Sequence, residues 1–268
     1  MTARPSTERQ HVLITGASSG IGAELARVFA EHGYDLVLVA RREAELAALG
    51  RQLAASHGVD FHVIPADLAD PVAPGQLVDT LRERGLTIDI LVNNAGYGLH
   101  GAFAQTDLDT ELRMIQLNVT ALTHLTKLLL PGMLARRRGR VLNVASTASF
   151  MPGPFMAVYY ATKAYVLSFS EAIANELQGT NVTVTALCPG PTHTGFAAAA
   201  SANRMQLFTG PRVMDAATVA RIGFAALMRG RRVVIPGFRN RWLIRAAGLL
   251  PRSLVLQITR RLQAPSPA

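Results

Sequence analysis

One stretch of the sequence decides the fold: residues 11–22 read HVLITGASSGIG. The first five of these residues are rich in β-branched and apolar types, as a short buried strand is. The glycines that follow allow a tight turn and a close approach of the backbone to a ligand. The N-terminus of a following helix attracts anions. The stretch therefore predicts a strand, a phosphate-binding turn and a helix. The alternative is a glycine-rich turn without a ligand, because the spacing differs from the G-x-G-x-x-G dinucleotide pattern.

Outward from this turn, short β-rich runs alternate with longer helical ones, which is typical of a parallel sheet with crossover helices. No repeat or low-complexity linker divides the 268 residues. We therefore expect a single α/β domain over 1–268: a doubly wound, seven-stranded parallel sheet with helices on both faces. Its core spans about 11–236, and 237–268 form a basic amphipathic extension. The predicted strands are 11–15, 35–40, 61–64, 88–92, 140–145, 182–187 and 232–235, and the predicted helices are 20–32, 43–56, 71–84, 108–134, 158–178 and 215–229.

The composition is that of a folded domain, with 49% hydrophobic and 17% charged residues. Cys188 is the only cysteine, which excludes an internal disulfide and fits a reducing compartment. The seven histidines show no metal-ligand spacing. No secretory signal or membrane-spanning segment is visible in the sequence. We therefore expect a cytoplasmic protein without a metal site.

The positive charge is concentrated at one end of the chain. Lysine and arginine number 27 against 18 acidic residues, but nine arginines lie at or after Arg229 and no acidic residue follows Asp215. Residues 1–228 are therefore balanced in charge. This distribution argues against nucleic acid as a partner.

The arginine-rich extension leaves two roles open. One is packing against the protein in a way that closes the substrate pocket, which is favoured because arginine stems cover apolar surface well. The other is peripheral contact with acidic lipid through an interfacial helix pair. The side chains that would then meet the lipid are Trp242, Leu243, Leu249 and Leu250.

The motifs along the chain resemble those of the short-chain dehydrogenase/reductase family. Its TGxxxGxG turn is matched at Thr15, Gly16, Gly20 and Gly22. In the family's order there follow NNAG at 93–96, Asn118, Ser146, Tyr159-x-x-x-Lys163, and Pro189-Gly190 followed by Thr194. The resemblance covers about residues 11–235. It implies a Rossmann fold, a nicotinamide dinucleotide cofactor and a homodimer or homotetramer.

The second predicted strand ends in Ala40-Arg41-Arg42, which bears on the choice of cofactor. An NAD site usually has an acidic side chain here, whereas the 2′-phosphate of NADP needs positive charge. Arg41 stands where the acid is expected, and guanidinium binds phosphate through paired hydrogen bonds. NADP(H) is therefore favoured over NAD(H), with Ser18 as a second phosphate contact. The alternative is that both arginines are solvated and that Glu43 pairs with one of them.

The resemblance extends the cofactor site along the carboxyl edge of the sheet. It implies that Asp67 and Leu68 contact the adenine. The residues expected to bind the cofactor are Gly16, Ser18, Ser19, Gly20, Ile21, Arg41, Arg42, Asp67, Leu68, Asn93, Ala95, Gly96, Tyr159, Lys163, Pro189, Gly190, Thr192 and Thr194.

Tyr159 and Lys163 are four residues apart, which places both on one face of a helix. A nearby ammonium stabilises phenolate, and together with an oxidised nicotinamide we expect it to lower the pKa of Tyr159 from about 10 toward 7. The resemblance implies that Tyr159 is the general acid/base, that Ser146 holds the substrate oxygen, and that Lys163 reaches the ribose. It also implies that Asn118 holds a water that feeds protons to the lysine. The alternative for Asn118 is a buried helix residue bonded to backbone.

Two segments predict an apolar substrate pocket: residues 150–156, and the residues after Pro189, which include Phe196 and four alanines. Ligand pockets are mostly apolar, so we expect a small hydrophobic ketone, aldehyde or alcohol as substrate. The alternative is that these residues pack in the core or at a subunit contact. Two rival functions also remain: a non-catalytic dinucleotide-sensing protein, and a membrane-associated lipid or 3-ketoacyl reductase.

Overall fold

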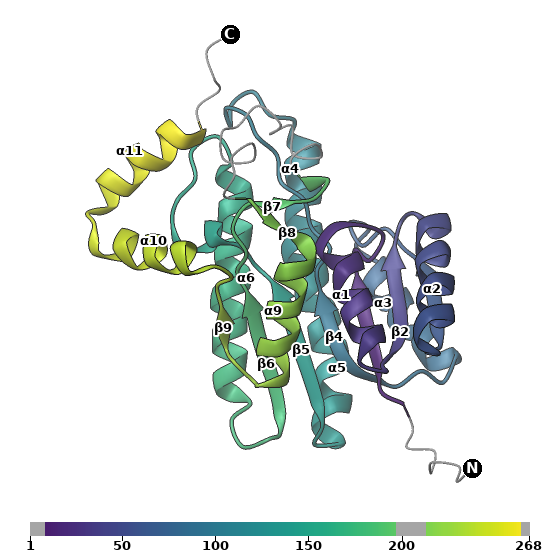
Figure 1. Ribbon diagram of the computed structural model, residues 1–268. Helices are drawn as coiled ribbons and strands as arrows, with labels where there is room; N and C mark the ends of the chain where they lie inside the picture. Colours follow the sequence, from purple (N-terminus) through teal and green to yellow (C-terminus); the bar gives the residue numbers. More distant parts are fainter. Residues whose placement is uncertain (1–8, 197–212, 264–268) are drawn as a thin grey trace.

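A computed structural model describes residues 9–196 and 213–263 of the chain. Its centre is a seven-stranded parallel sheet with the strand order β3-β2-β1-β4-β5-β6-β9 (Figure 1). This order confirms the predicted doubly wound α/β fold. The strands are β1 (His11–Thr15), β2 (Asp35–Ala40), β3 (Phe61–Pro65), β4 (Ile88–Asn93), β5 (Gly139–Val144), β6 (Val182–Leu187) and β9 (Val233–Val234).

Helices cover both faces of the sheet because side chains alternate along the buried strands. In β1, Val12 and Ile14 pack on one face, and Leu13 packs on the other. The first face is covered by α1 (Gly20–Glu31), α2 (Glu43–His57) and α9 (Ala216–Met228). The second face is covered by α3 (Ala73–Glu83), α5 (Leu122–Ala135) and α6 (Ala157–Glu176).

One predicted helix is not a continuous α-helix. The expected helix over 108–134 consists of α4 (Leu108–Ile115), a π-helical segment Gln116–Ala121, and α5. Asn118 lies in the π-helical segment, where its side chain bonds the backbone of Tyr97. A π-helical turn inside a helix often marks a functional site, but apolar spacing alone does not reveal it.

Three short elements were not predicted, two strands and a 3-10 helix, whereas a helix pair in the C-terminal extension was one of the two alternatives above. A short parallel ladder joins β7 (Thr192–His193) to β8 (Met214–Asp215), and each strand is too short to show a period. A 3-10 helix spans Thr147–Phe150. The C-terminal extension folds into α10 (Phe238–Leu249) and α11 (Arg252–Gln263), which project from one side of the molecule (Figure 1).

Candidate active site

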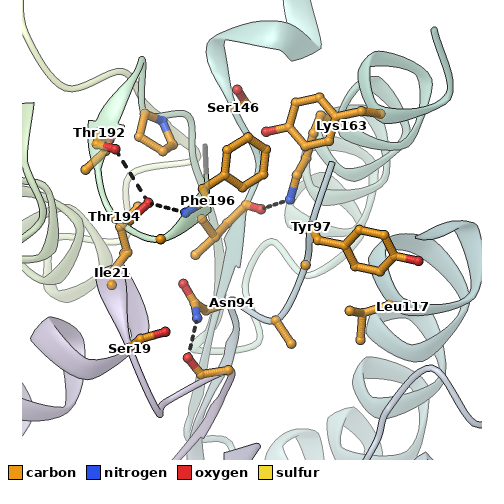
Figure 2. A pocket seen from close by; sticks show the side chains of 18 of the residues that line it. Ser19, Ile21, Asn94, Tyr97, Leu117, Ser146, Lys163, Thr192, Thr194 and Phe196 are labelled. Carbon is orange, nitrogen blue, oxygen red and sulfur yellow. Dashed lines mark hydrogen bonds between the residues drawn. The ribbon is translucent and has the colours of Figure 1, made fainter. Parts of the chain in front are cut away.

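The carboxyl ends of β1 and β4 meet where the strand order reverses, and Thr15 ties them together. The Thr15 hydroxyl accepts hydrogen bonds from the backbone nitrogens of Asn94 and Ala95, both at 3.0 Å. The Asn94 side chain in turn donates to the carbonyl oxygens of Thr15 and Gly16, and Figure 2 shows one of these two bonds. In open α/β sheets, ligands bind at this kind of reversal.

The turn after β1 requires glycine because of its backbone conformation and its close packing. Gly16 and Gly20 have φ angles of +66° and +57°, a region that other residues rarely adopt. A Cβ atom on Gly22 would lie 2.3 Å from the carbonyl oxygen of Gly16. Ser19, the residue before α1, makes no side-chain cap to the helix. The turn therefore exposes a helix N-terminus to a bound anion.

A cavity of about 770 Å³ follows the carboxyl edge of the sheet. It collects all the predicted cofactor and catalytic residues except Asn93 and Asn118. The predicted residues that line it are Gly16, Ser18, Ser19, Gly20, Ile21, Arg41, Arg42, Asp67, Leu68, Ala95, Gly96, Ser146, Tyr159, Lys163, Pro189, Gly190, Thr192 and Thr194.

Arg42 and Ser18 come together at one end of this cavity. The Arg42 guanidinium donates to the Ser18 hydroxyl at 3.1 Å and lies 3.4 Å from the Glu45 carboxylate. Arg41 also lines the cavity and is exposed. The pairing expected with Glu43 is replaced by one with Glu45, one helical turn into α2.

Two cavity residues beside Asp67 were missed. Arg113 forms an ion pair with Asp67 at 2.7 Å, and the Tyr97 hydroxyl donates to the carbonyl oxygen of Thr110 at 2.7 Å. Burial raises the pKa of Tyr97. Tyr97 directly follows the NNAG motif, and this position could have indicated it. Arg113 lies in α4, outside every quoted motif, and only the fold brings it to Asp67.

Tyr159 and Lys163 lie side by side on α6, as their spacing predicts. Both are buried, with 8% and 6% of their surface exposed. The Lys163 Nζ atom lies 5.9 Å from the centre of the Tyr159 ring. It donates to the carbonyl oxygen of Val144 at 2.8 Å (Figure 2).

The expected lowering of the Tyr159 pKa is not found. Burial raises the pKa of Tyr159 to about 12, and hydrogen bonding by Ser146 counteracts this only in part. Burial also lowers the pKa of Lys163 to about 8. Both shifts favour the neutral forms, because a buried charge loses its hydration. Burial therefore sets the direction of both shifts.

Ser146 follows β5 and caps the short 3-10 helix. Its hydroxyl accepts a hydrogen bond from the backbone nitrogen of Ala148 at 3.1 Å. The next turn is tied to α6, because the Ser149 hydroxyl donates to the carbonyl oxygen of Lys163 at 2.7 Å. Figure 2 shows Ser146, Lys163 and Phe196 around the same part of the cavity. The serine is therefore held in place relative to the Tyr159 helix.

The two asparagines outside the cavity wall have structural partners. Asn118 donates to the carbonyl oxygen of Tyr97 at 2.9 Å and to the Thr162 hydroxyl at 3.1 Å. Asn93 donates to the side chains of Thr126 and Asn143, at 3.0 and 2.9 Å, beneath the cavity. The bonding of the Asn118 side chain agrees with the backbone-bonded alternative. The side chain of Asn93 joins strands and helices and does not line the cavity.

Fewer of the predicted apolar residues line the cavity than the sequence suggests. Met156 and Phe196 line it, and the Phe196 ring lies 5.2 Å from that of Tyr159. Phe150 and Phe155 pack elsewhere, the former in a core cluster and the latter against Arg260. The four alanines at 197–200 lie outside the described residues. The cavity is also lined by residues that were not predicted, namely Ala40, Ala66, Ala69, Asn94, Thr110, Leu117, Val144, Ala145, Thr147, Ala148, Tyr160, Pro191 and Gly195.

Comparison with solved structures shows the same architecture. A short-chain dehydrogenase from Sphingobium yanoikuyae in complex with NADPH is 36% identical, with a TM-score of 0.80 over 89% of this chain and 93% of that one. The bulky-bulky ketone specific alcohol dehydrogenase from Comamonas testosteroni is 34% identical, with a TM-score of 0.78 over 90% and 92%. A short chain dehydrogenase/reductase from Burkholderia phymatum in complex with NAD is 26% identical, with a TM-score of 0.81 over 90% and 93%.

Sequence comparison agrees. Bovine dehydrogenase/reductase SDR family member 7B is 37% identical over 69% of this chain and 58% of its own length. The ketoacyl reductase HetN from a Nostoc species is 36% identical over 67% and 62%. The chain thus spans less than two thirds of these relatives. The family model described as short chain dehydrogenase matches residues 10–205. The chain therefore belongs to the short-chain dehydrogenase/reductase family.

Proposed function

We propose that this protein is an NADP(H)-dependent oxidoreductase that interconverts a hydrophobic ketone or aldehyde and its alcohol. The observation that carries the proposal is one cavity that joins Ser146, Tyr159 and Lys163 to the glycine turn at Gly16 and Gly20. The turn and its open helix N-terminus suit the pyrophosphate of a dinucleotide. A protein that only sensed the dinucleotide would not need the three polar groups beside it.

The cofactor, when bound, supplies or accepts hydride. The chain's own residues handle the oxygen and the proton. The Ser146 hydroxyl holds the carbonyl oxygen, and Tyr159 gives that oxygen its proton. A Tyr159 pKa of about 12 keeps the phenol protonated at neutral pH, so the residue is a proton donor. This protonated state is the one that carbonyl reduction requires.

Lys163 holds a charge near the donor. A pKa of about 8 leaves its amine mostly cationic at pH 7. The charge stabilises Tyr159 as it loses its proton, by attraction at short range in a buried site. The bond from Lys163 Nζ to the Val144 carbonyl oxygen fixes the position of that charge.

The preference for NADP(H) rests on positive charge at the end of β2. Arg42 is held on the Ser18 hydroxyl, and Arg41 lines the same end of the cavity. Guanidinium and hydroxyl groups suit a 2′-phosphate, and neither residue at the end of β2 is acidic. The Sphingobium neighbour, solved with NADPH, supports this choice, and the Burkholderia neighbour, solved with NAD, is the contrasting case.

The substrate class follows from Met156 and Phe196, which make the wall beside Tyr159 apolar. An apolar wall favours a hydrophobic carbonyl compound over a charged one. The names of two relatives, a ketoacyl reductase and a bulky-bulky ketone specific alcohol dehydrogenase, agree with this class. Faster turnover of small anionic ketones than of aryl or long-chain ketones would contradict it.

We further propose that the protein is a cytoplasmic homodimer or homotetramer. Leu108, Leu112 and Ile115 form an apolar stripe on α4 with exposed fractions of 68%, 53% and 38%. Such a stripe at helical spacing suits burial against a second copy. The single cysteine, Cys188, fits a reducing compartment. Light scattering of the purified protein measures the assembly, and a monomer at all concentrations would contradict it.

The test of the proposed reaction is Tyr159→Phe, which removes only the donor hydroxyl. We expect kcat/KM for ketone reduction to fall by about 10²–10⁴-fold, while NADPH binding, measured by calorimetry, is retained. Tyr165→Phe on the same helix is the matched control, because its hydroxyl contacts Thr123 away from the cavity. Unchanged turnover in Tyr159→Phe would reject the proposed reaction and favour a dinucleotide-sensing protein.

A further inference from the structure

The outer side of α10 carries an exposed apolar stripe. Phe238, Trp242 and Leu249 follow one another at helical spacing, with exposed fractions of 66%, 56% and 88%. The Phe238 and Trp242 rings contact each other with centroids 6.0 Å apart. The opposite side faces the protein through Asn240, whose side chain lies against Gly190 at the cavity. The stripe is therefore not the side by which α10 packs.

α11 also carries an exposed apolar stripe, about 100° around the helix from its packing side. Its inner side packs through the buried residues Val255, Thr259 and Gln263. Its outer side carries Leu254, Ile258 and Leu262, with exposed fractions of 42%, 42% and 50%. Gln263 also donates to the Tyr160 hydroxyl and accepts from His100 at 2.9 Å. The inner contacts hold α11 in place. Its outer stripe is therefore exposed on a helix that is already folded before any partner binds.

The charge around both stripes has one sign. The two helices carry six arginines and no acidic residue: Arg239, Arg241, Arg245, Arg252, Arg260 and Arg261. Within residues 9–196 and 213–263, none of these arginines forms an ion pair with a carboxylate. Only Arg260 has an aromatic partner there, the Phe155 ring. The other positive groups remain available to an external anion.

We propose that the outer face of α10 and α11 binds peripherally to a membrane surface rich in anionic lipid. An interfacial helix places its apolar side chains among the lipid chains and its arginines among anionic headgroups. The face offers both parts of this contact. None of the described helices is long and apolar enough to cross a bilayer, so the contact is with one leaflet.

Other occupants match the face less well. A second copy that used the same face would bring its own arginines against these, without carboxylates to pair with them. Nucleic acid would pair with the arginines but would leave Phe238, Trp242 and Leu249 exposed. An anionic bilayer satisfies both the charge and the apolar stripes. Packing and lipid contact are thus compatible, because the exposed stripes are not the sides by which the helices pack.

The native chain contains its own probe, since Trp242 is its single tryptophan. The full-length protein is titrated with vesicles of phosphatidylcholine containing phosphatidylglycerol, and with vesicles of phosphatidylcholine alone. We expect a blue shift of Trp242 emission with the anionic vesicles only, and its loss near 1 M NaCl, where the Debye length is about 3 Å. No shift at low salt, or equal binding to both vesicles, would overturn the proposal. A shift that follows protein concentration without lipid would overturn it in favour of self-association.

Variants then separate charge from apolar contact. Phe238→Ser should weaken the vesicle partition coefficient about tenfold or more, and Phe103→Ser is its control because Phe103 has a matching exposed fraction of 68%. Arg241→Gln and Arg245→Gln should each lower the partition coefficient about fivefold. Arg51→Gln on α2 is the control for these charge variants. Equal effects of test and control variants would overturn the proposal. Vesicle binding is measured without turnover, so failure of the membrane-binding proposal is distinguishable from failure of the proposed reaction.

Discussion

The ammonium of Lys163 lies 5.9 Å from the centre of the Tyr159 ring, and both side chains are almost completely buried. Burial favours the neutral form of each group: it raises the pKa of the phenol to about 12 and lowers the pKa of the amine to about 8. Between neutral pH and pH 8 the pair therefore holds both of its protons. It is prepared to give a proton to an oxygen held by Ser146, which suits reduction of a carbonyl group.

The first prediction concerns the pH dependence of ketone reduction. Lys163 must be cationic to support proton loss from Tyr159, and its pKa of about 8 means that the cation is present below pH 8 and lost above it. We expect kcat/KM to be constant from about pH 6 to 7.5 and to fall about tenfold for each pH unit above 8. Initial rates with NADPH over pH 6–10 measure this profile. A rate that rises toward pH 10 would contradict it.

The second prediction concerns stability. Burial lowers the pKa of Lys163 from 10.5 to about 8, so below pH 8 the folded state bears a charge that the unfolded state hydrates better. Removing this charge in Lys163→Met raises the free energy of unfolding by about 3 kcal/mol. Losing the bond to the Val144 carbonyl oxygen lowers it by about 1–2 kcal/mol. We expect the variant to be inactive but about 1–2 kcal/mol more stable at pH 7.

The sign of its pH dependence follows by linkage. As the pH rises from about 8 to 10.5, folded Lys163 is already neutral while the unfolded side chain still binds a proton. The wild type therefore gains stability relative to Lys163→Met over this range. Urea unfolding at pH 7, 8 and 9.5 measures the difference, and Lys127→Met, an exposed site on α5, is the control. A stability difference that grows with pH would refute the assignment.

The sequence predicted well those features that local geometry controls. Glycine is required at Gly16 by its backbone conformation, and a spacing of four residues puts Tyr159 and Lys163 on one helix face. It did not predict the direction of the Tyr159 pKa, because desolvation depends on how deeply the fold buries the ring. Asn93 was expected to contact the cofactor, and nothing in the sequence indicated that its side chain bonds Thr126.

The C-terminal helices illustrate the same limit. The composition of the tail indicated both packing and lipid contact, and the sequence analysis treated them as alternatives. The structure puts Val255 and Thr259 on the inner side of α11 and Leu254 and Ile258 on the outer side. Which side of a helix faces the protein depends on the orientation of that helix against the body, and apolar spacing alone does not specify this orientation.

The third prediction concerns cofactor choice. Arg42 contacts the Ser18 hydroxyl at 3.1 Å at the end of the cavity that Arg41 also lines. Removing the guanidinium in Arg42→Ala should raise the KM for NADPH by about 10–100-fold, the range of a charge-assisted hydrogen bond, and leave that for NADH nearly unchanged. Arg51→Ala, also on α2, controls for loss of surface charge. Equal effects on the two cofactors would show that Arg42 does not contact the 2′-phosphate.

The last prediction concerns the size of the substrate pocket. The Phe196 ring lies 5.2 Å from the Tyr159 ring, and a Cβ atom on Gly98 would lie 2.9 Å from the tip of Phe196. The phenyl group thus fills the space beside the Tyr159 ring, so Phe196→Ala should open this space. The amide nitrogen of Phe196, which bonds the Thr194 hydroxyl at 3.2 Å, is kept by this change. The backbone of the cofactor site therefore retains its support.

We expect Phe196→Ala to shift the ratio of kcat/KM values toward ketones with two bulky substituents by about tenfold or more, relative to acetone-sized ketones, since a whole ring of apolar contact is exchanged. Parallel assays of both classes at saturating NADPH give the ratio. Phe103→Ala is the control, because Phe103 does not line the cavity. If Phe196→Ala lowered both rates equally, the ring would act on the position of Tyr159 and not on substrate size, since loss of the donor's alignment slows every ketone alike.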